Sequence, residues 1–231
     1  MKTVIRVLLA LAICFLAYIC VMSVVTPIRF ENTREAREGA VVKNLVDLRT
    51  AMNEYRMQHG RYTTSIDSLV MFLREGTKKE VVKEGALTDK QLEAGLTEVK
   101  AVAMIAKAEK TGNWKDVDTN GLRGFRRDTI STPLVQALYK GEYTNETIEK
   151  IIYIPYTEGQ KYEVVVNDNY FTSQGIHVPL VMVRAHYNTY LGDQDAQERV
   201  NLIDKEEKLG HYPGLCFGSE YEPNNNAGNW E

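Results

Sequence analysis

The chain has 231 residues and a formal net charge of −3. This balance argues against the strongly basic surface that nucleic-acid-binding domains usually carry. Of its three cysteines, only Cys216 lies outside the apolar N-terminal run, so a framework of disulfides within the chain is excluded.

The first predicted element is an apolar helix. Val7–Val25 contains no charged residue. At a rise of about 1.5 Å per residue it is about 28 Å long, which is close to the hydrocarbon thickness of a bilayer. We expect residues 1–27 to form a retained membrane anchor, with a cleaved signal peptide and a lipoprotein as alternatives. The short tail carrying Lys2 and Arg6 favours a cytoplasmic N-terminus, which places the remaining chain outside the cytoplasm.

Residues 28–60 are predicted to continue as an amphipathic stem helix. Apolar residues recur there at spacings of four, three, four and three, which is one stripe along an otherwise charged helix. The pair His59-Gly60 is expected to end this helix, because glycine readily adopts the left-handed cap conformation. The residues of the stripe are Val41, Leu45, Leu48, Met52 and Tyr55.

Residues 61–128 are predicted to form a helical insertion. Ser65 or Thr64 can cap a short helix, and the lysine-rich segment Arg74–Gly85 is interpreted as a solvated linker. A capping box at Thr88–Gln91 then predicts one helix that runs to about Lys110.

Residues 129–231 are predicted to form a β-rich head with a closing C-terminal loop. Alternating and β-branched residues indicate strands, and Thr157–Gln160 is expected to join the first two as a hairpin. The three strand candidates are Lys150–Tyr156, Lys161–Asn167 and Val178–Tyr187.

The chain beyond Tyr187 is ambiguous. A further strand over Tyr187–Leu191 and a short helix ending before Gly210 are expected, and the Gly-, Asn- and Pro-rich segment Tyr212–Glu231 is interpreted as a loop or a frayed tail. The predicted fold class is therefore α+β. A long N-terminal transmembrane-plus-amphipathic helix packs against an antiparallel β-sheet head.

Two parts of the chain resemble the type IV pilin and pseudopilin family, in particular the major pseudopilin of type II secretion. The first is the stem, where Pro27 follows an apolar helix and the helix closes on His59–Tyr62. The second is the ending, Phe217–Glu220 followed by Asn224–Trp230. The chain also departs from the family in three ways. Thr63 stands where the family has a proline, no glycine precedes the apolar run, and the run contains no acidic residue. The departures predict that a prepilin peptidase does not process the chain.

The resemblance implies a pilin-like fold and a non-enzymatic structural or assembly subunit of a bacterial secretion or pilus-like envelope machine. Such a subunit is a single-pass protein of the inner (cytoplasmic) membrane with its head in the periplasm. Its partners are the membrane and other subunits of an envelope complex, further copies of itself included, and not nucleic acid. The departures favour an alternative, a membrane-tethered periplasmic sensor or adaptor that binds a ligand or protein without polymerising.

The closing loop of this family often carries calcium on two aspartates. By position these correspond to Glu220 and Asn226, so a calcium site on these two residues is the one cofactor that the resemblance implies. No catalytic residues are predicted. The sequence contains no nucleophile-elbow, phosphate-loop or zinc-protease motif, and an enzyme is therefore not expected.

Overall fold

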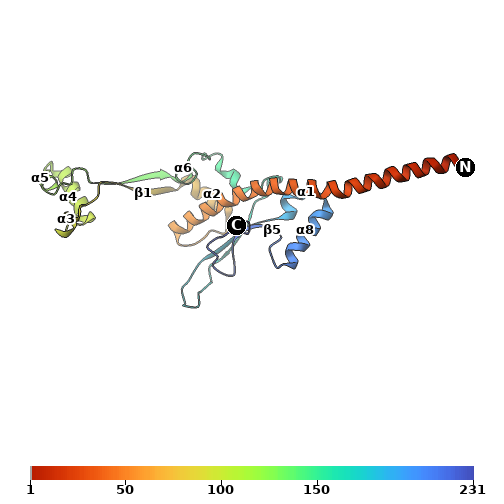
Figure 1. Ribbon diagram of the computed structural model, residues 1–231. Coiled ribbons are helices and arrows are strands. Elements are labelled where there is room, and N and C mark those ends of the chain that lie inside the picture. Colours follow the sequence, from red (N-terminus) through yellow and green to blue (C-terminus); the bar gives the residue numbers. More distant parts are fainter. Residues whose placement is uncertain (1) are drawn as a thin grey trace.

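The computed structural model describes residues 2–231, apart from the side chains of residues 2, 80–83 and 128–129. Figure 1 shows three parts in a row: a long helix that extends freely from the head, the head itself, and an arm that ends in a small helical tip. The architecture is α+β, with one long N-terminal apolar helix and two small antiparallel sheets.

Helix α1 (Lys2–His59) joins the predicted anchor and the predicted stem without interruption. Pro27 lies inside it, where the missing N–H removes one backbone hydrogen bond. The predicted stem helix is confirmed. Its stripe residues Val41, Leu45 and Leu48 are fully buried against the head, and the helix ends before Gly60 in the left-handed conformation, with φ of 74°.

The head wraps one face of α1 with short helices and a three-stranded sheet. Its core joins the stem stripe to Leu69, Ile151 and Phe217, which come from three separate parts of the chain. The elements around this core are α2 (Ile66–Glu75), α6 (Leu134–Tyr139), the 3-10 helix η1 (Ile148–Ile152), α7 (Tyr187–Tyr190) and α8 (Ala196–Lys208).

The sheet has the order β3-β4-β5, and both pairs of strands are antiparallel. Strand β4 (Leu180–His186) is the central one and alternates buried and half-buried residues. Strands β3 (Glu163–Asn167) and β5 (Gly214–Gly218) flank it. Gly218 has φ of 76°, and a side chain there would collide with the backbone oxygen of Val181, so the end of β5 requires glycine.

The arm is a two-stranded antiparallel ribbon of β1 (Thr77–Glu84) and β2 (Arg126–Pro133). It leaves and re-enters the head at one point, where the backbone N–H of Leu134 donates to the oxygen of Gly76 at 3.0 Å. Beyond the ribbon, α3 (Asp89–Glu93), α4 (Glu98–Thr111) and α5 (Lys115–Thr119) form the tip. The tip has its own core, consisting of Leu96, Ala101, Ala108, Val117, Leu122 and Phe125.

Two predictions in the insertion are wrong. The segment Arg74–Gly85 is not a linker, because most of it is strand β1, whose partner lies about 50 residues later in the chain. The single helix predicted up to Lys110 is two helices, since Gly95, with φ of 79°, separates α3 from α4. Helix α2 lies within the predicted insertion 61–128 but contributes to the head core, so the part that leaves the head is residues 77–133.

The head contains three further corrections. Lys150–Tyr156 is not a strand, because Ile151 and Ile152 are buried from the short helix η1, and only Tyr153 bridges to Lys161. Tyr187–Leu191 is helix α7 rather than a strand. The C-terminal segment is not only loop, since it supplies β5, whereas the third predicted strand is confirmed as β4.

Candidate membrane anchor and head surfaces

The N-terminal part of α1 makes no contact with the head. Every residue from 3 to 21 is exposed, Met22, Val25 and Pro27 are partly buried, and Phe30 is the first buried side chain along the helix. Within the described residues, α1 is the one helix that is long and apolar enough to cross a membrane. A free apolar helix of this length fits a membrane anchor, and an N-terminal signal sequence has the same properties.

Polar contacts fix the stem to the head along its length. Arg37 donates to both carboxylate oxygens of Asp193 at 2.5 and 2.8 Å. These hydrogen bonds lower the pKa of Asp193 to about 2. The hydroxyl of Tyr143 donates to Asp47 at 2.6 Å, and burial raises the pKa of that aspartate. These directional hydrogen bonds, together with the apolar packing, therefore fix the rotation of the head about the stem axis.

The C-terminal loop closes on the upper stem. Arg49 pairs with Glu231 at 2.5 Å and donates to the backbone oxygen of Asn226 at 3.3 Å. The side-chain amide of Asn226 donates to the Asn53 oxygen at 2.7 Å and to the Tyr62 hydroxyl at 2.9 Å. Asn226, which was predicted as a calcium ligand, thus joins the loop to α1 through its hydrogen bonds.

Glu220 lies on the same loop but has different neighbours. Its backbone oxygen accepts from the Asn167 amide at 2.8 Å, and its carboxylate is hydrogen-bonded to Tyr221. Across the described residues, no group of three or more His, Cys, Asp or Glu side chains is arranged to hold a metal ion. Calcium on Glu220 and Asn226 stays a prediction, which titration of the full chain with Ca²⁺ checks directly.

A groove of about 570 Å³ opens beside this loop. The last two turns of α1 contribute Asn53, Arg56 and Met57, and the loop contributes three consecutive asparagines ending at Asn226. Amide groups both donate and accept hydrogen bonds, so the lining suits a polar chain such as a peptide backbone. Asn225 and Asn226 have φ of 57° and 56°, a conformation that asparagine tolerates better than most residues.

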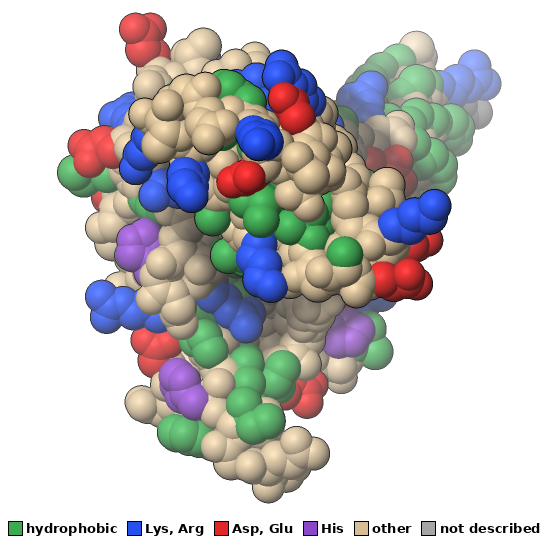
Figure 2. All heavy atoms as spheres, turned by 90° about the vertical axis from the view of Figure 1, so that its left-hand side faces the viewer, with side chains coloured by type: hydrophobic (Ala, Val, Ile, Leu, Met, Phe, Trp, Pro, Cys, Tyr) green, Lys and Arg blue, Asp and Glu red, His purple; other side chains and the backbone are tan. Residues whose placement is uncertain are grey.

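The tip presents a second surface at the far end of the arm. Val99 and Val102 of α4 are exposed, although the opposite side of the same helix is buried in the tip core. A groove of about 320 Å³ next to them is lined by Trp114 and Phe125. Figure 2 looks at the molecule from this end and shows hydrophobic side chains exposed among lysine and arginine side chains.

Cys216 is a buried side chain rather than a reactive thiol, because burial raises its pKa to about 11. The pair of Arg37 and Asp193 was not predicted from the sequence, and neither was the placement of α8 beside the stem. Asp195 was an available signal for α8, since its carboxylate caps the helix by accepting from the N–H groups of Gln197 and Glu198.

Comparisons with protein-family models, with curated proteins and with solved structures gave no match to this chain.

Proposed function

We propose that this chain is a non-enzymatic, membrane-anchored structural or assembly subunit of a bacterial envelope machine of the secretion or pilus-like kind. In this proposal residues 1–27 remain in the inner membrane, and the head and arm lie in the periplasm. The chain would hold partner subunits, further copies of itself included, at defined distances from the bilayer.

The observation that carries the proposal is the continuity of α1. One helix supplies both the free apolar segment and the buried stripe of the head, so the proposed anchor and the head are joined by continuous helix. A tethered enzyme or a freely diffusing domain has no need of such a joint. An assembly subunit does, because its contacts must be presented at a fixed height and orientation.

The arm supports the same proposal. Its ribbon of eight residues per strand spans about 26 Å and carries a tip with exposed Val99 and Val102. Exposed apolar side chains at the end of a projecting arm are typical of a surface that contacts another protein.

Site-specific photo-crosslinking of the full chain in cells tests the proposal. A crosslinker at Val99 is expected to capture a defined envelope protein or a second copy in the membrane fraction. A crosslinker at Met71, which is exposed on α2 of the head, is the matched control. Recovery of a soluble protein cleaved after the apolar run would contradict the anchored state.

A membrane-tethered sensor or adaptor is the second candidate. The observation that favours it is the amide-lined groove beside the C-terminal loop, which suits a ligand or peptide. A periplasmic peptide that raises the melting temperature of the full chain, with the effect abolished by Arg56→Ala, would support this candidate. Arg61→Ala is its control, because Arg61 is exposed and does not line the groove.

A further inference from the structure

The α1–α8 crevice lies where the head meets the proposed anchor. It has a mouth of about 220 Å³, lined by Pro27, Phe30 and Leu202 among others, and an inner part of about 660 Å³ that reaches Trp230. Arg34 and Lys205 line both parts, so the two hollows lie next to each other.

The mouth lies at the depth of lipid headgroups. The apolar run ends at Val25, and Phe30 is about 8 Å further along the helix. The headgroup layer of a bilayer extends about 5–8 Å beyond the hydrocarbon on each side. In Figure 1, α8 runs across the direction of α1 at the end of the head that is nearer the anchor, so it would lie along the membrane surface.

Two side chains of opposite charge on α8 face this mouth. Lys205 and Glu198 are seven residues apart, which places them on the same face of the helix two turns from each other. Among the described residues neither side chain forms an ion pair. Arg34, by contrast, is occupied by Glu31 at 2.6 Å and Glu38 at 3.5 Å.

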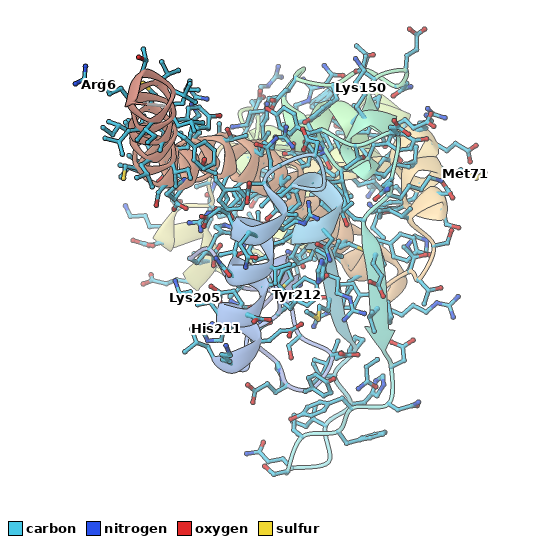
Figure 3. The ribbon with its side chains drawn as sticks, turned by 90° about the vertical axis from the view of Figure 1, so that its right-hand side faces the viewer. Arg6, Met71, Lys150, Lys205, His211 and Tyr212 are labelled. Carbon is cyan, nitrogen blue, oxygen red and sulfur yellow. The ribbon has the colours of Figure 1, made fainter. Side chains whose placement is uncertain are left out.

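Figure 3 looks at the molecule from the anchor side and shows how these groups lie. Lys205 and His211 project from the same side of the α8 region, and Tyr212 lies nearer the sheet. His211 pairs with Glu206 at 3.2 Å, so within the crevice Lys205 is the cation that remains available for a bound anion.

The charges of the mouth decide which headgroup fits. Two cationic side chains, Arg34 and Lys205, face two carboxylates, Glu31 and Glu198. A headgroup with only negative charge would be attracted by Lys205 but repelled by Glu198. A headgroup with both charges can give its phosphate to Lys205 and its ammonium to Glu198, and a primary ammonium can also donate hydrogen bonds to the carboxylate.

We propose that the α1–α8 crevice binds the headgroup of a phosphatidylethanolamine molecule of the surrounding bilayer, with Lys205 on the phosphate and Glu198 on the ammonium. This inference rests on the proposed anchoring, because only a retained α1 brings the crevice to the headgroup layer. The bound lipid would fix the rotation of the head relative to the membrane surface.

Native mass spectrometry of the full chain, released from nanodiscs with equal phosphatidylethanolamine and phosphatidylglycerol, tests the proposal. Wild type is expected to retain phosphatidylethanolamine in preference. Glu198→Lys is expected to reduce the ratio of retained phosphatidylethanolamine to phosphatidylglycerol about fivefold, as for loss of one partly exposed charge contact. Lys205→Glu, which removes the phosphate contact, is expected to reduce the amount of retained phosphatidylethanolamine by a similar factor. Lys208→Glu is the control, because Lys208 is on the same helix but does not line the crevice.

Retention of both lipids in their bulk ratio by wild type would overturn the proposal, as would equal losses in Lys205→Glu and Lys208→Glu. Displacement of the retained lipid by soluble glycerophosphoethanolamine would point to a free metabolite and would also overturn it. Melting curves of each variant separate loss of binding from loss of fold. Failure of the chain to remain in the nanodisc would refute the anchoring itself, an outcome that is distinct from a change in lipid ratio.

Discussion

The head and the tip are two hydrophobic cores built by different means. The head core gathers residues from across the chain around α1, and the stem residues at its centre are fully buried. The tip core has six buried residues, two of which are alanine, and all of them lie between Leu96 and Phe125. A unit of about 40 residues seldom stabilises itself without assistance. The long helix therefore supplies the head with a stability that the tip lacks.

The largest effect is expected from removing a side chain at the centre of the head. Leu48→Ala leaves a cavity beside a fully buried position and should reduce the free energy of unfolding by about 3 kcal/mol. Urea denaturation of the detergent-solubilised chain, followed by circular dichroism, measures it. The matched control is Val99→Ala, at an exposed position of the tip, which should change stability by less than about 0.5 kcal/mol. Equal effects of the two substitutions would show that Leu48 contributes no more to stability than an exposed side chain.

A second substitution tests whether the tip unfolds alone. Phe125→Ala should remove about 3 kcal/mol from the small tip core, which is enough to unfold it while the head remains intact. Hydrogen exchange is the measurement: amides of α4 should lose protection, and amides of β4 should keep theirs. Loss of protection in β4 as well would show that the two cores unfold together.

Excision of the arm and tip tests whether the head is stable without them. Gly76 and Leu134 are joined by a hydrogen bond of 3.0 Å, so a short Gly-Asn turn can replace residues 77–133. The head should then lose about 2 kcal/mol, because its core includes no residue of the ribbon but the buried carboxylate of Glu54 loses its ion pair with Lys78 at 3.3 Å. A urea midpoint far below that of the full chain would show that the head depends on the arm.

The smallest effect concerns the pair of Arg37 and Asp193. Arg37 holds the pKa of Asp193 in the folded chain at about 2, below its ordinary 3.8. The contribution of this pair to the free energy of unfolding is therefore complete above about pH 4. It is lost as the pH falls through about 2. The carboxylate is mostly exposed, so the contribution should stay below about 1 kcal/mol. Asp193→Asn should flatten the difference in stability between pH 5 and pH 2, and an unchanged slope would exclude this pair as its source.

The elements that the sequence predicted correctly are those with a long local pattern. The stem was predictable because its apolar stripe persists over four turns, and Ser65 and Gly60 mark the helix boundaries on either side of the loop between α1 and α2. The ribbon was missed because Lys78 and Lys79 show no apolar alternation, and pairing with a distant strand leaves no local trace.

The helix η1 was predicted as a strand because the residue types were weighted more than their spacing. Ile148, Ile151 and Ile152 recur at intervals of three and one, which suits one face of a helical turn, yet their β-branched side chains favoured a strand. The crevice could not be predicted at all. Helix α8 was expected, but the face that it turns toward α1 depends on Leu202 packing into the core, which is a tertiary contact.

In the proposed anchored state, α1 runs as one helix from the anchor into the head, so a tilt of this helix would carry the head and the arm with it. In that state the stem would add about 48 Å beyond the bilayer and the ribbon about 26 Å more, so the tip would stand roughly 70 Å above the membrane. A change of about 10° in helix tilt, well within the range seen for membrane helices, would swing the tip sideways by about 12 Å. Small changes in bilayer thickness would thus become large movements at the point where a partner is met.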